Sequence, residues 1–271
     1  PVTSAALLRA IELNAVAVEG NKQAFHWGRR AAADPEGVDS IARKQKPTMP
    51  QHRLSQSLDE ALARRRDYLT AYQDRAYARR YTVLVERTRR AETALLPGST
   101  VLTEAVARYY FKLLAYKDEY EVARLYAAPE FARALGSAFD GAFKLRFHLA
   151  IPALSRPDPV TGEPAKRPYG AWLMSAFRLL APMKFLRGTP FDVFGYGAER
   201  RVERALIADY EATLGVLLGS LAADTLGLAA EIAALPETIR GYGPVKERSV
   251  AAARIRQAEL MQAIKDRKTG K

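Results

Sequence analysis

Apolar residues recur every three or four positions along most of the chain, which is the spacing of one face of an α-helix. Two segments show this spacing most clearly. The apolar positions of residues 100–126 are Leu102, Val106, Tyr109, Leu113, Tyr116, Tyr120 and Ala123. The apolar or bulky positions of a helix beginning near Ala198 are Val202, Leu206, Tyr210, Thr213 and Leu217. Each set predicts a helix with one face buried against its neighbours.

Start and stop signals mark the other helices. The run Ser57-Leu58-Asp59-Glu60 has the form of a capping box, so a helix is expected from Leu58 to about Leu95, before Pro97-Gly98. Further helices are expected over residues 4–34 with an interruption at Gly20, 129–136, 171–187 and 224–234. The segment LPETIRGYGPVKERSV then leads into a final helix that ends at about Lys265. Residues 171–187 are apolar nearly all round, which predicts a central buried helix that kinks or breaks at Pro182.

The period changes to two at residues 143–149. Phe143, Leu145, Phe147 and Leu149 alternate there with basic residues, which predicts a short strand with one buried face. Because a strand needs a partner, a second strand is expected in the proline-rich loop 152–170 or in another chain. The predicted fold is therefore mainly α, a helical bundle-like domain with one or two short β-strands around residues 143–149.

A change of composition divides the chain. Residues 36–56 are rich in proline, charged and polar side chains, which predicts an exposed linker. We therefore expect residues 1–35 to end one domain, residues 36–56 to form the linker and residues 57–271 to form a helical C-terminal domain. The first residue is Pro1 rather than Met, so we expect a processed chain or a segment of something larger, and we favour the segment.

Charge and cysteine content narrow the possible functions. Lys and Arg number 42 against 30 Asp and Glu, a net charge of +12, which predicts an acidic partner such as nucleic acid, an anionic ligand or an acidic protein surface. The chain has no cysteine, so it cannot ligate an iron–sulfur cluster or a thiolate zinc site. His26, His52 and His148 lack the spacing of a metal-binding pair, and no metal site is predicted.

Neither a signal peptide nor a membrane span is visible in the sequence. The most apolar stretch, residues 171–186, is shorter than the roughly 20 residues that cross a bilayer. It also contains Arg178, Pro182 and Lys184. The expected location is therefore the cytoplasm.

Arginine and tyrosine alternate in the helix expected from Leu58. Ten arginines lie from Arg53 to Arg90, and the tyrosines between them are Tyr68, Tyr72, Tyr77 and Tyr81. Guanidinium groups neutralise phosphates and rings stack on bases, so the pattern is typical of a nucleic-acid-binding helix. The alternative is a solvated helix whose tyrosines pack inward, and we favour it.

Asp118, Glu119 and Glu121 are candidates for general acids. Basic residues lie close to each of them in the sequence, and acidic groups in such surroundings usually form ion pairs. We therefore favour ion pairs, including a pair between Glu121 and Arg124 on a helix surface. No catalytic residue is predicted in this chain.

Two short glycine loops precede basic helix starts. Gly195-Tyr196-Gly197 comes before three arginines, and Gly241-Tyr242-Gly243 comes before a second basic group. Glycine permits positive φ in such turns, and the free N–H groups of a helix start attract anions. The predicted anion-binding residues are Gly195, Gly197, Arg200, Arg201, Arg204, Lys246 and Arg248. The alternative is that the glycines only shape the turns and the arginines pair with local carboxylates.

Four runs of residues resemble, in order, the C-terminal region of the long, fused indolepyruvate ferredoxin oxidoreductases. The runs are RYYFKLLAYKDEYEVARLY, FKLRFHLA, AFRLLAPMKFLRGTPFDVFGYGAERRVERALIADYE and LPETIRGYGPVKER. The opening AIELNAVAVEGNKQAFHWGRRAAADP resembles the end of the gamma-type domain of 2-oxoacid oxidoreductases. The resemblance covers most of the chain, except the linker after Pro35 and the arginine-rich helix.

The resemblance implies oxidative decarboxylation of an aryl pyruvate to an acyl-CoA by the whole enzyme. That reaction uses thiamine diphosphate, Mg²⁺, 4Fe-4S clusters and coenzyme A, with ferredoxin as electron acceptor. This chain lacks cysteine and a thiamine-binding GDG run, so the implied role is a non-catalytic portion that binds none of these cofactors itself. The expected partners are the catalytic domains or subunits of an oligomeric holoenzyme, and ferredoxin. The alternative, from another class, is a basic helical nucleic-acid-binding module.

Overall fold

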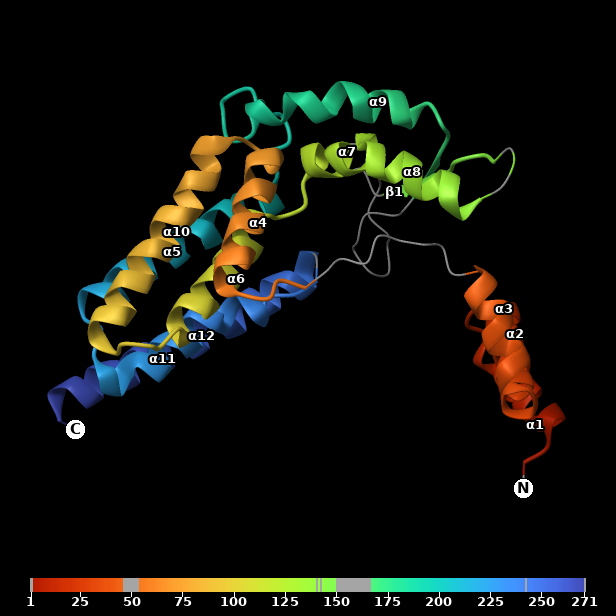
Figure 1. Ribbon diagram of the computed structural model, residues 1–271, viewed down its shortest axis with the longest axis horizontal. Helices are drawn as coiled ribbons and strands as arrows, with labels where there is room; N and C mark the ends of the chain where they lie inside the picture. Colours follow the sequence, from red (N-terminus) through yellow and green to blue (C-terminus); the bar gives the residue numbers. More distant parts are fainter. Residues whose placement is uncertain are drawn as a thin grey trace. The chain divides into compact units, whose positions relative to one another are not determined.

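The computed structural model describes residues 2–45, 54–139, 141, 143–149, 167–241 and 243–270. Most of these residues are helical, and one two-stranded antiparallel sheet accompanies the helices (Figure 1). This confirms the predicted mainly α fold with short strands. The chain divides into two compact units, residues 1–52 with 132–141 and residues 53–131 with 142–271.

Three helices form the N-terminal part of the smaller unit: α1 (Ser4–Asn14), α2 (Val18–Ala33) and α3 (Pro35–Gln45). The Thr3 hydroxyl caps α1 by accepting a hydrogen bond from the Ala6 amide at 3.2 Å, as the sequence predicts. The single helix expected over residues 4–34 is wrong. The chain breaks at Ala15 and Ala17, which both have positive φ, whereas Gly20 lies inside α2.

Helix α3 corrects the linker expected over residues 36–56. Asp34 begins this helix, because its Oδ1 accepts a hydrogen bond from the Gly37 amide at 2.9 Å. Pro35 occupies the first helical position, where its missing N–H costs nothing. Residues 46–53 of the expected linker lie outside the described part of the chain, and the predicted division at residues 35 and 56 stays a prediction.

The larger unit contains most of the helices. Its α-helices are α4 (Leu58–Tyr72), α5 (Arg75–Leu95), α6 (Val101–Leu114), α7 (Glu119–Ala127), the start of α8 (Pro129–Ala138), α9 (Leu173–Leu180), α10 (Ala198–Gly219), α11 (Leu226–Ala234) and α12 (Gly243–Thr269). Its short 3₁₀ helices are η1 (Ala181–Leu186), η2 (Ala223–Thr225) and η3 (Leu235–Glu237).

Aspartate caps divide two segments that were each expected to be a single helix. The Asp74 carboxylate accepts from the Tyr77 amide at 2.8 Å and begins α5. Asp118 accepts from the Glu121 amide at 2.8 Å and begins α7. Because the apolar spacing continues across both breaks, the spacing alone predicted uninterrupted helices over residues 58–95 and 100–126.

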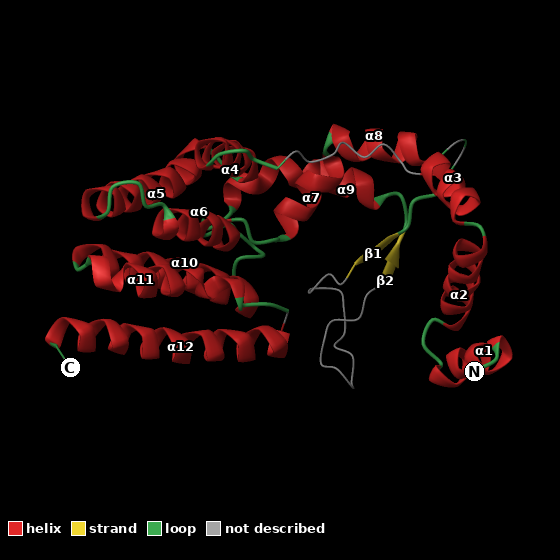
Figure 2. Ribbon diagram, turned by 60° about the horizontal axis from the view of Figure 1, so that its bottom comes forward, coloured by secondary structure: helices red, strands yellow, loops and turns green. Residues whose placement is uncertain are grey.

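Helices of the larger unit pack in layers around one main core. Figure 2 shows α4 and α5 on one side, then α6, then α10 with α11, and α12 as the outermost helix. All seven apolar positions predicted between residues 102 and 123 are buried. Tyrosine rings connect the layers: Tyr110 stacks on Tyr81 at 6.0 Å and on Tyr210 at 5.7 Å between ring centroids.

A second, smaller core lies where α7, α9 and the sheet meet. Its buried residues are Ala123, Phe147, Leu173 and Phe177. Strand β1 (Phe147–Leu149) pairs antiparallel with β2 (Arg167–Tyr169), which is the partner strand predicted for the loop 152–170. Phe147 is buried as predicted, whereas Phe143 lies outside the strand and is exposed.

The central buried helix expected over residues 171–187 is wrong. Helix α9 ends at Leu180, and the 3₁₀ helix η1 begins at Ala181 with Pro182 in its first turn, so the predicted break at this proline is confirmed. Leu173 and Phe177 are buried, but Trp172 is 62% exposed and Leu179 is 73% exposed. Some of the apolar side chains that led to the prediction of complete burial are therefore exposed to solvent among the described residues.

Candidate functional site

The loop from Arg187 to Gly197 joins η1 to α10 and rests on a buried ion pair. Arg187 is 5% exposed. Its Nε and Nη2 donate to Oδ2 and Oδ1 of Asp118 at 2.5 and 2.9 Å, and its Nη1 donates to the backbone oxygen of Tyr72 at 2.9 Å. Since Asp118 begins α7 and Tyr72 ends α4, this one side chain ties the loop to two helices.

Aromatic rings enclose the guanidinium group of Arg187. Its central carbon lies 3.8 Å from the ring centroid of Tyr72 and 5.6 Å from that of Tyr120. Burial alone would lower the pKa of Arg187, but the Asp118 carboxylate and the nearby tyrosines raise it above its ordinary value. Burial, with the negative charge of Asp118, raises the pKa of Tyr116 to about 12. At neutral pH the arginine is therefore charged and the tyrosine is protonated.

Asp192 holds the rest of the loop in a tight turn. Its carboxylate is buried and accepts hydrogen bonds from the amides of Gly188 at 2.9 Å and Gly195 at 3.0 Å. Arg204 approaches the same carboxylate at 3.8 Å and donates to the backbone oxygen of Gly195. A Cβ on Gly195 would lie only 2.4 Å from Oδ2 of Asp192, so the turn requires glycine at this position.

Tyr120 packs beneath the same turn. Its ring meets the ring of Phe194 edge to face at 5.3 Å, and its hydroxyl is buried without a hydrogen bond of standard geometry. Burial first, and the negative charge of Asp192 second, raise the pKa of Tyr120 to about 12. The inner side of the loop is thus made of buried charges and rings that fix its backbone.

The loop and η1 also bear large apolar side chains that are exposed. Phe185, Phe191, Val193 and Tyr196 are 65–75% exposed, and we name these four residues the outer apolar set. The Tyr196 hydroxyl donates to the backbone oxygen of Pro190 at 2.8 Å, so its ring is held in place. Large apolar side chains therefore face solvent on a loop whose backbone is fixed by buried contacts.

The predicted anion-binding arginines on α10 are largely paired. Arg200 lies 3.4 Å from the Glu119 carboxylate, and Arg204 is bound within the Asp192 turn. Gly195 and Gly197 are not among the glycines with positive φ, so the turn does not use the positive φ that glycine permits at either position. The glycine at 195 is required by the close Asp192 carboxylate instead.

An ion pair joins the helices that follow the two glycine loops. Lys246 on α12 binds Glu203 on α10, which brings the starts of the two helices together. Gly241 and Gly243 both have positive φ, and Tyr242 lies outside the described residues. Of the predicted anion-binding cations, only the side chains of Arg201 and Arg248 are exposed and unpaired among the described residues. The pairing favours the alternative in which the basic residues neutralise local carboxylates, and the anion site stays a prediction.

The three candidate general acids form ion pairs. Asp118 pairs with Arg187, Glu119 with Arg200, and Glu121 with Arg124 at 2.7 Å. These contacts confirm the favoured interpretation.

The tyrosines of the arginine-rich segment face inward rather than toward solvent. Tyr72, Tyr77 and Tyr81 donate to the backbone oxygens of Tyr116, Leu114 and Ala107 at 2.9–3.0 Å. Tyr68 donates to the Glu121 carboxylate at 2.5 Å. These contacts confirm the inward packing and leave no tyrosine of the segment free to stack on a base.

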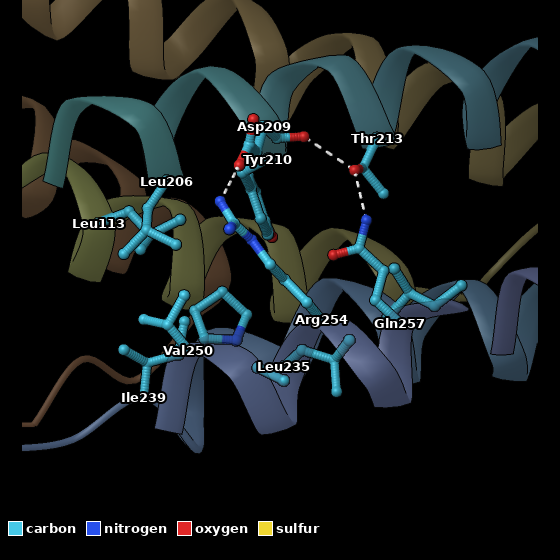
Figure 3. A pocket seen from close by; sticks show the side chains of 13 residues that line it. Leu113, Leu206, Asp209, Tyr210, Thr213, Leu235, Ile239, Val250, Arg254 and Gln257 are labelled. Atoms are coloured by element: carbon cyan, nitrogen blue, oxygen red, sulfur yellow. Dashed lines mark hydrogen bonds and ion pairs between the residues drawn. The ribbon is translucent and has the colours of Figure 1, made fainter. Parts of the chain in front are cut away.

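A small cavity lies between α10 and α12, away from any cluster of reactive groups (Figure 3). Leu206 and Val250 contribute apolar lining, and an ion pair of 2.9 Å joins Asp209 to Arg254 beside it. Its volume is about 50 Å³, which holds roughly one or two waters but not a substrate. The cavity is therefore a packing feature of the helix seam.

Within the described ranges, no group of three or more His, Asp or Glu side chains could hold a metal ion. None of the described helices is both long and apolar enough to cross a bilayer. Sequence reasoning missed the buried network of Arg187, Asp118 and Asp192. The available signal was an aspartate between Gly188 and Gly195, because closely spaced glycines allow a carboxylate to approach the backbone.

Comparison with known proteins gives one match. The family described as "Family of unknown function (DUF6537)" matches residues 58–259. The match begins at the first residue of α4 and ends within α12, so it covers more than half of the chain and includes the whole loop from Arg187 to Gly197. No curated protein and no solved structure matches the chain.

Proposed function

We propose that this chain, which belongs to the DUF6537 family, is the non-catalytic C-terminal portion of an indolepyruvate ferredoxin oxidoreductase and supports assembly of that enzyme. The four sequence runs that resemble this enzyme support the identity. Two of them form the buried network, since the first contains Asp118 and the third contains Arg187 and Asp192.

The single observation that supports an assembly role best is the outer apolar set. Its side chains cost free energy when exposed to water, since burying a large apolar side chain gains about 1.5–3 kcal/mol. A flexible loop could fold them inward, but the buried contacts of Arg187 and Asp192 hold the loop backbone in place. We therefore propose that the catalytic domains of the oxidoreductase cover this surface.

The residues of this chain do not fit the cofactors of the whole enzyme. A 4Fe-4S cluster needs thiolate ligands and the sequence has no cysteine. The acidic side chains near the loop are bound to arginines or backbone amides, which leaves them unsuited to hold Mg²⁺. In this proposal, thiamine diphosphate, Mg²⁺, the clusters and coenzyme A bind to other domains in the cytoplasm.

Binding between separately produced parts tests the proposal. The 271-residue chain would be titrated against the remaining domains of the oxidoreductase, with dissociation constants from light scattering or calorimetry. We expect Phe191→Ser with Val193→Ser to weaken binding at least about tenfold, because both remove central apolar contacts. The matched control is Val216→Ser with Ile255→Ser, which removes exposed aliphatic side chains of α10 and α12. The assembly role would be rejected if the original chain did not bind the remaining domains, or if the two double variants lost the same amount of affinity.

A further inference from the structure

One face of α5 bears arginines without partners. The buried positions of this helix are Ala78, Tyr81, Val85, Thr88 and Glu92, and the opposite positions are exposed. We name the exposed residues Arg75, Arg79, Val83, Arg87 and Arg90 the arginine face. None of its four guanidinium groups forms an ion pair or hydrogen bond with a described residue. Along the helix the four charges span roughly 22 Å.

Local stability does not explain this arrangement. Other arginines of the segment are paired, Arg80 with Glu211 at 2.6 Å and Arg89 with Asp59 at 2.6 Å. Arg75 lies in the first turn of α5, where a positive charge opposes the helix dipole, and repels Arg79 one turn later. The carboxylates of α5 do not neutralise the face, because Glu92 is buried and Glu86 lies beside Arg89 at 3.5 Å.

The arginine face also has an apolar centre and borders a groove. Val83 lies among the arginines and is 57% exposed. A groove of about 360 Å³ runs between α4 and α5, with Leu62, Ala63 and Val85 as its apolar lining. Its two carboxylates, Asp59 and Glu86, both pair with Arg89 at 2.6 and 3.5 Å. Figure 2 shows α4 and α5 together on one side of the layered unit, and none of the described helices of this unit lies on the side of α5 away from α6.

We propose that the arginine face and this groove bind an acidic amphipathic helix of a partner protein. Guanidinium groups bind carboxylates through paired hydrogen bonds, and protein interfaces combine an aliphatic centre with arginine around it. A nucleic acid fits less well, because the tyrosines of this segment are hydrogen-bonded inside the core and cannot stack on bases. This surface does not include the outer apolar set, and the proposal does not depend on the enzyme to which the chain belongs.

Fluorescence anisotropy with a defined probe tests this surface. The probe is a labelled 21-residue peptide of roughly two-thirds glutamate, with leucine at alternating spacings of three and four, titrated into the full chain. Arg79→Glu with Arg87→Glu should weaken binding at least about tenfold, because attraction becomes repulsion. The matched control, Arg178→Glu with Lys265→Glu, makes the same change of net charge at other exposed positions and should change affinity by less than about twofold. Val83→Ser, which changes no charge, should also weaken binding severalfold, to roughly a third or less of the original affinity.

Three results would overturn the proposal. If both charge-reversed variants lost the same amount of affinity for the peptide, binding would depend only on the net charge of the chain. Tighter binding of a 20-nucleotide oligothymidylate, lost in the same variant, would identify a nucleic-acid surface instead. Absence of peptide binding to the original chain at low salt would reject the surface altogether. Circular dichroism of every variant must match the original chain, and none of these measurements requires the oxidoreductase domains.

Discussion

Glu92 is a buried carboxylate whose hydrogen bonds join two helices. It accepts from the amides of Leu102 and Thr103 at 3.0 and 2.8 Å, and from the hydroxyls of Ser99 and Thr103 at 2.7 and 2.6 Å. Burial alone would raise its pKa, but these hydrogen bonds lower the pKa below its ordinary value of 4.5. A side chain at the end of α5 thus supplies the missing partners of the first turn of α6.

Replacement of Glu92 should reveal this contribution as a dependence of stability on pH. Because the pKa is lower in the folded state, the stabilisation is present above about pH 4.5 and is lost as the pH falls through the folded value. We expect Glu92→Gln to lower the free energy of unfolding by about 2–4 kcal/mol at pH 7. The difference in the free energy of unfolding between this variant and the original chain should become smaller below pH 4.

Urea unfolding at pH 7, 5, 4 and 3 measures this prediction. The control is Glu86→Gln on the same helix, whose exposed ion pair with Arg89 at 3.5 Å should contribute less than about 1 kcal/mol. If the two free energies of unfolding differed by the same amount at every pH, the lowered pKa of Glu92 in the folded state would be contradicted. Glu92 lies at helical spacing from the buried residues Ala78, Tyr81 and Val85, so its place on the buried face of α5 could be predicted. Its hydrogen-bond donors come from the start of α6 and the turn before it, and these could not be predicted from the local sequence.

At the scale of elements, the loop from Arg187 to Gly197 is built by contacts that are distant in sequence. Apolar residues recur at helical spacing in α6 and in α10, so the buried faces of these two helices could be predicted from the sequence. The breaks at Asp74 and Asp118 could not, since apolar spacing continues through them. Arg187 meets Asp118 from 69 residues away, and no periodic signal reports such a pair.

Two glycines of this loop make a matched pair for testing the turn. A Cβ at Gly195 would lie 2.4 Å from the Asp192 carboxylate, which is fixed by two amides, whereas a Cβ at Gly197 would lie 3.5 Å from the nearest atom. We expect Gly195→Ala to lower the free energy of unfolding by about 1–3 kcal/mol and Gly197→Ala to change it by less than about 0.5 kcal/mol. Thermal unfolding followed by circular dichroism measures both. Equal effects would mean that the carboxylate is not held as described.

At the scale of the whole molecule, the spacing of apolar residues could predict the class of fold but not the exposed surface. Absence of cysteine excludes thiolate-bound clusters from this chain at once. The outer apolar set was not separable from core residues in the sequence, because Phe185 and Phe177 give the same hydrophobic signal. They differ only in what covers them: Phe177 on α9 is buried against Tyr126 of α7 and Phe147 of β1, and Phe185 is 66% exposed.

The rate of thiol labelling at Val193 tests most directly whether a partner covers this loop. Because the chain has no cysteine of its own, a Val193→Cys variant has one thiol, and a Val216→Cys variant on α10 serves as the control, since both side chains are more than half exposed. Labelling by a maleimide would be followed by mass spectrometry in the isolated chain and in the oxidoreductase that we propose it helps to assemble. We predict that assembly slows labelling of the Val193→Cys variant by about tenfold or more and leaves the control unchanged. Equal rates for the Val193→Cys variant in the isolated and assembled protein would contradict the account.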